Sequence, residues 1–391
     1  MRIISCIYAV SKREVKAILG DRLYLTTLAV LPVVMMLFFA FFFAHGTIDN
    51  LPIAVVDSDH SAMSRKLTSM IDATRGAKVI VSVNSAIEAQ DLALKGEVYG
   101  YVVIPDKFEN SIVSSAPANV EVVISGANLS AAGVLRNSIQ QAIMTLSSGV
   151  AISRLEADGV SEYEVMADVM PINTLTHIVA NPYINYGYYL APMFMFVGVV
   201  VFTMLMTIYA IGREIRYGTA WRWLATASSS LFAALVGKLL PVTIMMMLVT
   251  GLILLILSSV MGMALGGNII VLMLVSLLFI LAYQAIAIAF VSITANLRLA
   301  LSLGGGYSVM AFTFSGITFP TLAMYGIARG LSHIFPFTYY SDFFIRYTMM
   351  DVDIEYLYTD IATIMLFIFI LALVWRRLSR VVRHRAYWGR D

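Results

Sequence analysis

The sequence has 391 residues, of which 60% are hydrophobic and 13% are charged, and its formal net charge is +2. A soluble domain of this size does not need so much apolar surface, so the composition excludes an ordinary soluble protein and indicates a chain whose solvent is the lipid bilayer. The single cysteine, Cys6, excludes an internal disulfide framework and a cysteine-based zinc site.

The first segment, residues 1–23, has apolar residues near helical spacing with basic residues between them. This pattern predicts a basic amphipathic helix in the cytoplasmic membrane interface. A plain cytoplasmic extension of the first membrane span is the alternative. The charged residues of this predicted interface helix are Lys12, Arg13, Glu14 and Lys16.

Six apolar runs reach the length of a membrane-spanning helix, which is roughly 20 residues. They cover residues 24–44, 183–211, 237–261, 268–293, 301–318 and 358–375. The fifth run contains three consecutive glycines, and the apolar segment after it, 319–340, is interrupted by proline and glycine. We interpret 319–340 as a helical hairpin that re-enters the membrane from outside and packs against protein. An aromatic-rich interfacial loop is the alternative. The predicted fold is thus an α-helical polytopic membrane protein with six transmembrane helices and a re-entrant helical hairpin after the fifth.

Residues 45–182, between the first two runs, form one hydrophilic insert with fifteen acidic and eight basic residues. Short apolar runs typical of strands alternate in it with amphipathic segments typical of helices. The predicted strands are 53–57, 78–83, 99–105 and 120–125. The predicted helices are 61–73, with Ser61 as its N-cap, 85–97 and 131–157. The insert is therefore predicted to be a small α/β domain.

Lysine and arginine near the ends of the runs indicate the orientation in the membrane. Basic residues gather in residues 1–23, in the loop 212–236 and in the tail 376–391. All of these segments fall on one side if both termini are cytoplasmic. The acidic insert 45–182 then lies outside the cytoplasm.

Apart from residues at their ends, the six runs contain no Asp, Glu, Lys, Arg or His. Proton- and ion-driven transporters usually need ionisable groups inside the membrane, so a proton-coupled carrier is disfavoured. The one Gly-Lys pair, Gly237-Lys238, lacks the upstream glycine and the following Ser or Thr of a phosphate-binding loop. We therefore expect no enzymatic site in the chain, and a partner must supply the energy for any transport.

The loop 212–236, which begins GREIRYGTAWRWL, is the richest predicted cytoplasmic loop in residue types of protein interfaces. Arg and Glu form charge-assisted hydrogen bonds, glycine permits a tight turn, and Trp and Arg are enriched at interface hot spots. We expect this loop to contact an energy-supplying partner. Anchoring at the membrane surface is the alternative, and the two roles are compatible. The predicted coupling residues are Arg213, Glu214, Arg216, Tyr217, Gly218, Thr219, Trp221, Arg222 and Trp223.

This loop and the start of the next run carry a resemblance to a known family. The stretch GREIRYGTAWRWLATASSSLFAALVGKLLP resembles the loop of type 2 ABC-exporter permeases, in which R-E-x-x-x-G-T, a small and serine-rich stretch, and G-K-x-x-P follow the second span. Trp221 stands where that pattern usually has an acidic residue, and the usual Ser-Pro is absent. The matching residues are Arg213, Glu214, Gly218, Thr219, Gly237, Lys238 and Pro241.

Other segments resemble the same family in the same order along the chain. Residues 12–21 are similar to its N-terminal interface helix, and 51–67, 96–112 and 120–135 are similar to the extracytoplasmic insert of its bacterial multidrug-exporter subgroup. Residues 312–320 and 335–353 are similar to the segment after the fifth span, where the family has re-entrant helices. The resemblance implies a substrate exit along 312–340, and the residues expected there are Phe314, Gly316, Phe319, Pro320, Pro336 and Tyr339.

The resemblance implies the permease subunit of an ATP-driven exporter, which moves small hydrophobic or amphipathic, drug-like compounds out across the bacterial inner membrane. Two separate ATP-binding subunits would bind ATP and magnesium and push on a coupling helix at 212–223, while this chain itself would hold no cofactor and no metal. A second permease copy or a paralogue would complete a dimer. A periplasmic adaptor with an outer-membrane channel, which often serves such permeases, would dock on 45–182; no nucleic acid is expected.

Two other functions stay open at this point. One is a non-transporting membrane receptor or scaffold that senses a ligand through its α/β domain. The other is export of a lipid-linked glycan, against which the large insert argues, because glycan-exporting relatives typically lack it.

Overall fold

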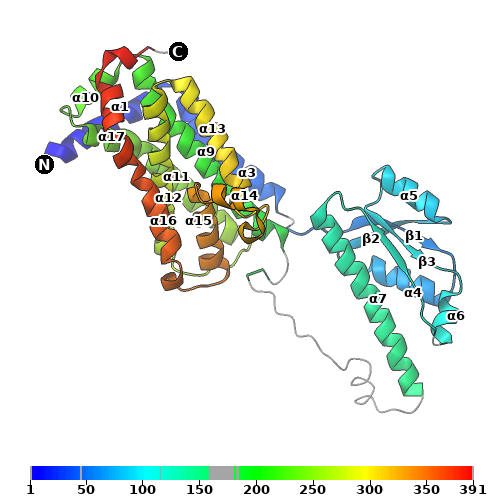
Figure 1. Cartoon of the computed structure of the whole chain (residues 1–391). Coiled ribbons are helices and arrows are strands. Elements are labelled where there is room, and N and C mark those ends of the chain that lie inside the picture. The colour runs from blue at the N-terminus through cyan, green and yellow to red at the C-terminus, as the bar shows by residue number, and fades with distance from the viewer. Residues whose placement is uncertain (1, 45, 115, 158–179, 182–184, 390–391) are drawn as a thin grey trace. The chain divides into compact units, whose positions relative to one another are not determined.

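The computed structural model describes residues 2–44, 46–114, 116–157, 180–181 and 185–389, and the chain divides into two compact units (Figure 1). One unit comprises residues 1–46 and 178–391, and the other comprises residues 47–177. The end of the predicted insert (158–179 and 182), the start of the predicted second run (183–184) and the last two residues of the predicted tail lie outside the described residues.

The smaller unit contains one four-stranded sheet in the order β2-β1-β3-β4. β1 (Leu51–Asp57) lies parallel to β2 (Ala77–Val83) and to β3 (Gly100–Ile104), whereas β4 (Glu121–Ile124) lies antiparallel to β3. Each strand overlaps one of the four strands predicted from the sequence. The predicted strand–helix alternation is therefore confirmed.

Helices cover both faces of this sheet because β1 is apolar on both faces, as is usual for a central parallel strand. Ile53 and Val55 lie in the core formed with α4 (Ala62–Asp72), α6 (Phe108–Val113) and α7 (Leu129–Ala157). Ala54 and Val56 lie in a smaller core with α5 (Ala86–Leu94). Ser61 caps α4 as predicted, since its hydroxyl accepts a hydrogen bond from Ser64 N. The six-residue α6 has no counterpart among the predicted helices.

The larger unit has five helical segments that are long and apolar enough to cross a membrane. The first, Arg22–Phe42, is built from α2 (Arg22–Leu25), a π-helical turn (Thr26–Val30) and α3 (Leu31–Phe42). The others are α9 (Tyr186–Arg216), α11 (Leu231–Ser259), α12 (Ile269–Thr294) and the pair α16 (Tyr358–Ile368) and α17 (Ile370–Arg383). These five segments overlap five of the six predicted runs.

At the predicted fifth span, 301–318, the structure has a helix that begins and ends earlier than predicted, α13 (Leu297–Thr313). Asn296 caps it by accepting a hydrogen bond from Leu299 N. Its 17 residues correspond to about 25 Å, at the short end of the range of about 17–25 residues for membrane-spanning helices. α13 packs along α9, and Gly304 allows the close approach, since a Cβ there would lie 2.5 Å from Ile208 Cδ1.

The segment predicted as a re-entrant hairpin, 319–340, contains short helical elements. They are a 3-10 turn (Thr321–Ala323), α14 (Gly326–Ser332) and the first part of α15 (Pro336–Phe344). A π-helical turn (Ile345–Met349) and a 3-10 turn (Ile354–Tyr356) lead to α16. The Thr338 N–H donates to Phe335 O, and the Thr338 hydroxyl donates to Ser332 O. The connection between α14 and α15 is therefore tight and hydrogen-bonded.

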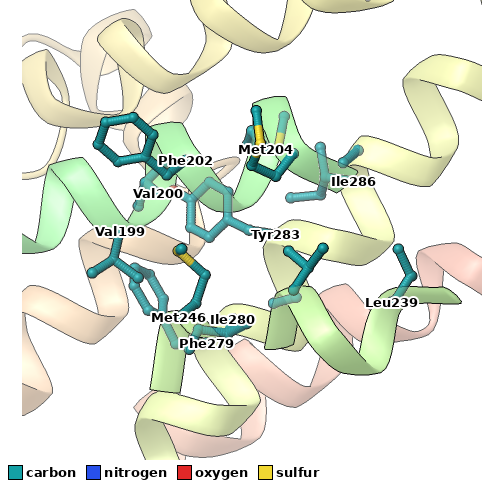
Figure 2. Close-up of a cluster of buried hydrophobic side chains, with 14 of the residues drawn as sticks. Val199, Val200, Phe202, Met204, Leu239, Met246, Phe279, Ile280, Tyr283 and Ile286 are labelled. Carbon is teal, nitrogen blue, oxygen red and sulfur yellow. The ribbon is translucent and has the colours of Figure 1, made fainter. Parts of the chain in front are cut away.

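α9 is the central helix of the larger unit, and α3, α11, α12 and α13 pack against it. Figure 2 shows how apolar side chains of α9, α11 and α12 interleave, with Val199 of α9 beside Met246 of α11 and Phe279 of α12. Phe279 also stacks on Tyr340 of α15, with ring centroids 4.0 Å apart. Close packing of this kind drives helix association in a bilayer, where the lipid tails are as apolar as the side chains.

The first helix, α1 (Arg2–Gly20), lies against α11 along much of its length. Gly237 of α11 permits this contact, since a Cβ at that position would lie 2.7 Å from the Ile7 carbonyl oxygen and 2.7 Å from Val10 Cβ. Ser11 donates a hydrogen bond of 2.7 Å to the Gly237 carbonyl at the same place. α1 ends at Gly20, and Asp21 then starts α2, so α1 and the first span are separate helices.

We predict that Gly237→Ala destabilises the larger unit by about 1–3 kcal/mol, because the added methyl group overpacks the contact between α1 and α11. Gly251→Ala on the same helix is the matched control, since its Cβ would meet only Met273 Cε at an ordinary 3.8 Å. Thermal unfolding in detergent measures the difference. Equal melting temperatures for the two variants would contradict the close contact.

Candidate functional site

One end of the larger unit brings together α1, the loop between α9 and α11, and the C-terminal segment (Figure 1). The loop contains α10 (Ala220–Thr226), which contacts α1, α11 and α17. Segments more than 200 residues apart in the sequence therefore meet here, as the bond between Ser11 and Gly237 illustrates. This end contains every residue predicted for coupling and for the interface helix.

The loop begins with a glycine-dependent helix end. Gly218 has a φ of +66°. Its N–H bonds to Ile215 O, and Thr219 N–H bonds to Glu214 O, which is the hydrogen-bond pattern of a Schellman C-cap. Glycine adopts this left-handed conformation without strain. The turn places the Thr219 hydroxyl 2.5 Å from Glu214 Oε2, so the sequence R-E-x-x-x-G-T folds back onto its own glutamate.

A buried ion network forms the centre of the site. Lys238 Nζ lies 2.5 Å from Glu14 Oε2 and 2.9 Å from Glu214 Oε1, and the Lys238 side chain is only 1% exposed. Arg13 approaches both oxygens of Glu214, at 2.7 and 2.9 Å. Two cations and two anions therefore balance, and each carboxylate accepts further hydrogen bonds. Such pairing is required because an unpaired charge away from water costs several kcal/mol.

The network joins three helices. Glu14 and Arg13 belong to α1, Glu214 to the end of α9, and Lys238 to the second turn of α11. Neither Glu14 nor Glu214 is accessible, at 2% and 4% exposure. Arg13 and Glu14 thus fix the predicted interface helix to α9 and α11, while Lys12 and Lys16 remain exposed.

A second polar cluster lies beside the first and shares the Glu14 carboxylate with it. The Tyr24 hydroxyl donates to Glu14 Oε1 at 2.9 Å, and the Tyr209 hydroxyl donates to Asp21 Oδ2 at 2.9 Å. The Arg213 guanidinium lies 5.7 and 5.6 Å from the Tyr24 and Tyr209 ring centroids. Burial opposes ionisation of Asp21, but hydrogen bonds from Tyr24 N–H and the Tyr209 hydroxyl, with Arg213 nearby, hold the pKa of Asp21 below its usual value.

The two tryptophans of the loop occupy opposite environments. Trp223 is fully buried, and its Nε1 donates to Ala234 O at 3.1 Å. Its ring centroid lies 5.3 Å from Lys238 Nζ, within the range of a cation–π contact. Trp221 is 50% exposed, and Arg222 stacks over it at 5.1 Å.

The predicted coupling residues differ in exposure: two are buried, three are exposed, and four are half-buried, namely Arg213, Arg216, Gly218 and Thr219. Glu214 and Trp223 are buried, so their side chains cannot touch a partner in this structure, and the expectation of direct contact needs correction for both. Tyr217, Trp221 and Arg222 are exposed. The buried group fixes the loop to the helix bundle, and the exposed group forms the surface that a partner can reach, which we call the outer loop surface.

The C-terminal segment packs on this loop, which sequence reasoning did not predict. α17 extends the sixth predicted span into the predicted tail as far as Arg383, whose guanidinium donates to Ser229 O at 3.1 Å. Gly389 N–H donates to Ile215 O at 3.1 Å, and Trp388 Nε1 donates to Val381 O at 3.3 Å. Tyr387 and Trp388, which follow a run of arginines, were the available signal for a docked tail.

Only three of the six predicted exit residues lie at the same cavity. Gly316, Pro320 and Tyr339 line a cavity of about 470 Å³ together with Asp342 and Asp360. The other exit residues do not line it: Phe314 stacks on Phe335, Pro336 is at the start of α15, and Phe319 is 53% exposed. Within the described ranges, no three His, Cys, Asp or Glu side chains are arranged to hold a metal ion.

Comparison with known proteins gives one match. A family model described as "ABC-2 family transporter protein" matches residues 22–376. No curated protein and no solved structure matches the chain. The matched range includes the whole loop, α11 and Lys238, but begins after α1.

We predict that Lys238→Met lowers stability by about 3–5 kcal/mol, because it leaves Glu14 and Glu214 buried with too little positive charge. The double variant Glu14→Gln/Lys238→Met should recover part of this loss, since Arg13 and Glu214 remain as a balanced pair. Thermal unfolding in detergent measures both. Lys16→Met, on the exposed side of α1, is the control and should melt near the wild type. A double variant less stable than the single one would argue against a charge-balanced network.

Proposed function

The chain belongs to the ABC-2 transporter family, and from this membership we propose that it is the membrane permease of an ATP-driven exporter of small hydrophobic or amphipathic compounds. The ATP would be bound, with magnesium, by two separate cytoplasmic subunits. A second permease, identical or paralogous, would complete the membrane dimer. The complex would lie in the bacterial inner membrane with both termini of this chain in the cytoplasm.

The observation that carries this proposal is the connection between the outer loop surface and the buried ion network. Trp221 and Arg222 are exposed, while Trp223 next to them is fixed against Ala234 and Lys238. A force on the exposed side chains therefore acts on α9, α11 and α1 together. A coupling element needs this combination, because a loosely held loop would absorb the movement of the ATP-binding subunit.

An exporter for apolar cargo also fits the character of the helix bundle. The five membrane-crossing segments are apolar, and flexible methionines are frequent among them, for example Met245, Met246 and Met247. Methionine adapts to ligands of different shape. The 470 Å³ cavity at Tyr339 is of the size of a small-molecule site and would serve the exit path. The α/β domain would offer the docking surface for a periplasmic adaptor.

We predict that the tagged chain co-purifies from its native membrane with an ATP-hydrolysing subunit, and that Trp221→Ala/Arg222→Ala lowers this association by roughly tenfold or more, as expected for a hot spot. Tyr358→Ala is the matched control, since Tyr358 is also an exposed aromatic residue, at 68% against 50% for Trp221, in a different helix. ATP hydrolysis per purified permease is the measurement. If no ATP-hydrolysing protein co-purifies with the wild-type chain, the result would favour the function of a receptor or scaffold instead.

A further inference from the structure

The α/β domain contains two adjoining cavities of about 570 and 610 Å³. Both are lined by Ile112 of α6 and by Leu146, Val150 and Arg154 of α7. The three shared apolar side chains therefore form a ridge with open space on each side. Both volumes fall in the range of about 300–1,000 Å³ that is typical of small-molecule sites.

Most of the residues that line these cavities are apolar. The first includes Leu67 and Phe108, which are part of the buried core of the domain. The second includes Met63 and Met70 of α4, which are partly buried. Methionine side chains adapt to flexible apolar ligands. A hydrocarbon chain that lies along the ridge would therefore be in contact with apolar surface on both sides.

The charges at the cavities are all positive. Arg154 lines both cavities and Lys66 lines the second, and neither cavity has an Asp or Glu in its lining. Among the described residues, neither Lys66 nor Arg154 has an ion-pair partner. This is unexpected in an insert with fifteen acidic and eight basic residues. A cationic group beside an apolar wall is complementary to a ligand with an anionic head and an apolar chain.

We propose that this double cavity binds a single-chain amphipathic carboxylate of the fatty-acid class. The carboxylate is bound by the Arg154 guanidinium, with Lys66 adding positive charge at the second cavity. The acyl chain lies against Ile112, Leu146 and Val150. The site is confined to the α/β domain, so the proposal does not depend on the function proposed for the membrane unit.

Fluorescence titration with a dansyl-labelled undecanoic acid tests the proposal on the full chain in phosphatidylcholine nanodiscs, with empty nanodiscs as background. We expect saturable binding with blue-shifted emission. Arg154→Gln should weaken the affinity for the probe by roughly tenfold, because it removes one charge-assisted hydrogen bond to the carboxylate. Arg136→Gln is the matched control, since Arg136 is an exposed arginine of α7 that lines neither cavity.

The primary amide of the same probe separates head-group recognition from apolar adsorption. We expect the amide to bind at least roughly tenfold more weakly than the carboxylate to the wild type, and equally to the wild type and to Arg154→Gln. Val150→Asp should abolish binding of both probes. If Val150→Asp does not fold, Arg154→Gln still tests the proposal, because it changes a side chain outside the domain core. Equal affinity for acid and amide, or no effect of Arg154→Gln, would overturn the proposal and leave the cavities as a contact surface for a partner protein.

Discussion

The structure depends on one interaction, the burial of the Lys238 ammonium between the carboxylates of Glu14 and Glu214. An ammonium group removed from water is costly, and it is tolerated only when opposite charges are held close in fixed geometry. That requirement fixes the positions of three helices at once, because each partner belongs to a different helix. Gly237 lets α1 approach, the Gly218 turn presents Glu214 and Thr219, and Tyr24 orients Glu14. These neighbouring contacts thus all help to hold the carboxylates of Glu14 and Glu214 beside the Lys238 ammonium.

The network also explains why buried and exposed residues lie close together in the loop. α10 buries one face and exposes the other, so Trp223 is buried against Lys238 while Trp221 is left exposed. The C-terminal segment adds a second attachment, since Arg383 bonds to the loop at Ser229 and Gly389 bonds to the end of α9. A surface fixed in this way moves with the bundle, which is what the proposed transmission of force from an ATP-binding subunit requires.

Much of the architecture could be predicted from local pattern. The strands and helices of the α/β domain, the Ser61 cap and five of the six spans follow from apolar periodicity and turn residues, which are properties of neighbouring positions. The network could not be predicted, because Glu14 and Lys238 are 224 positions apart and only the fold brings them together. Trp221 and Trp223 are the same residue type, so composition could not tell the buried one from the exposed one. The helix at the predicted fifth span, α13, begins earlier than predicted because Asn296 caps its first turn.

The central claim is that α1 and the loop behave as one rigid body during transport. Cys6, the sole cysteine, tests it directly, because its Sγ lies 3.4 Å from the Ser228 hydroxyl across the contact between α1 and the loop. The Ser228→Cys variant should form a disulfide on oxidation, and the cross-linked complex should keep its ATP hydrolysis and cargo export. Loss of both on oxidation, with full recovery on reduction, would show that α1 and the loop must separate, and would contradict the account.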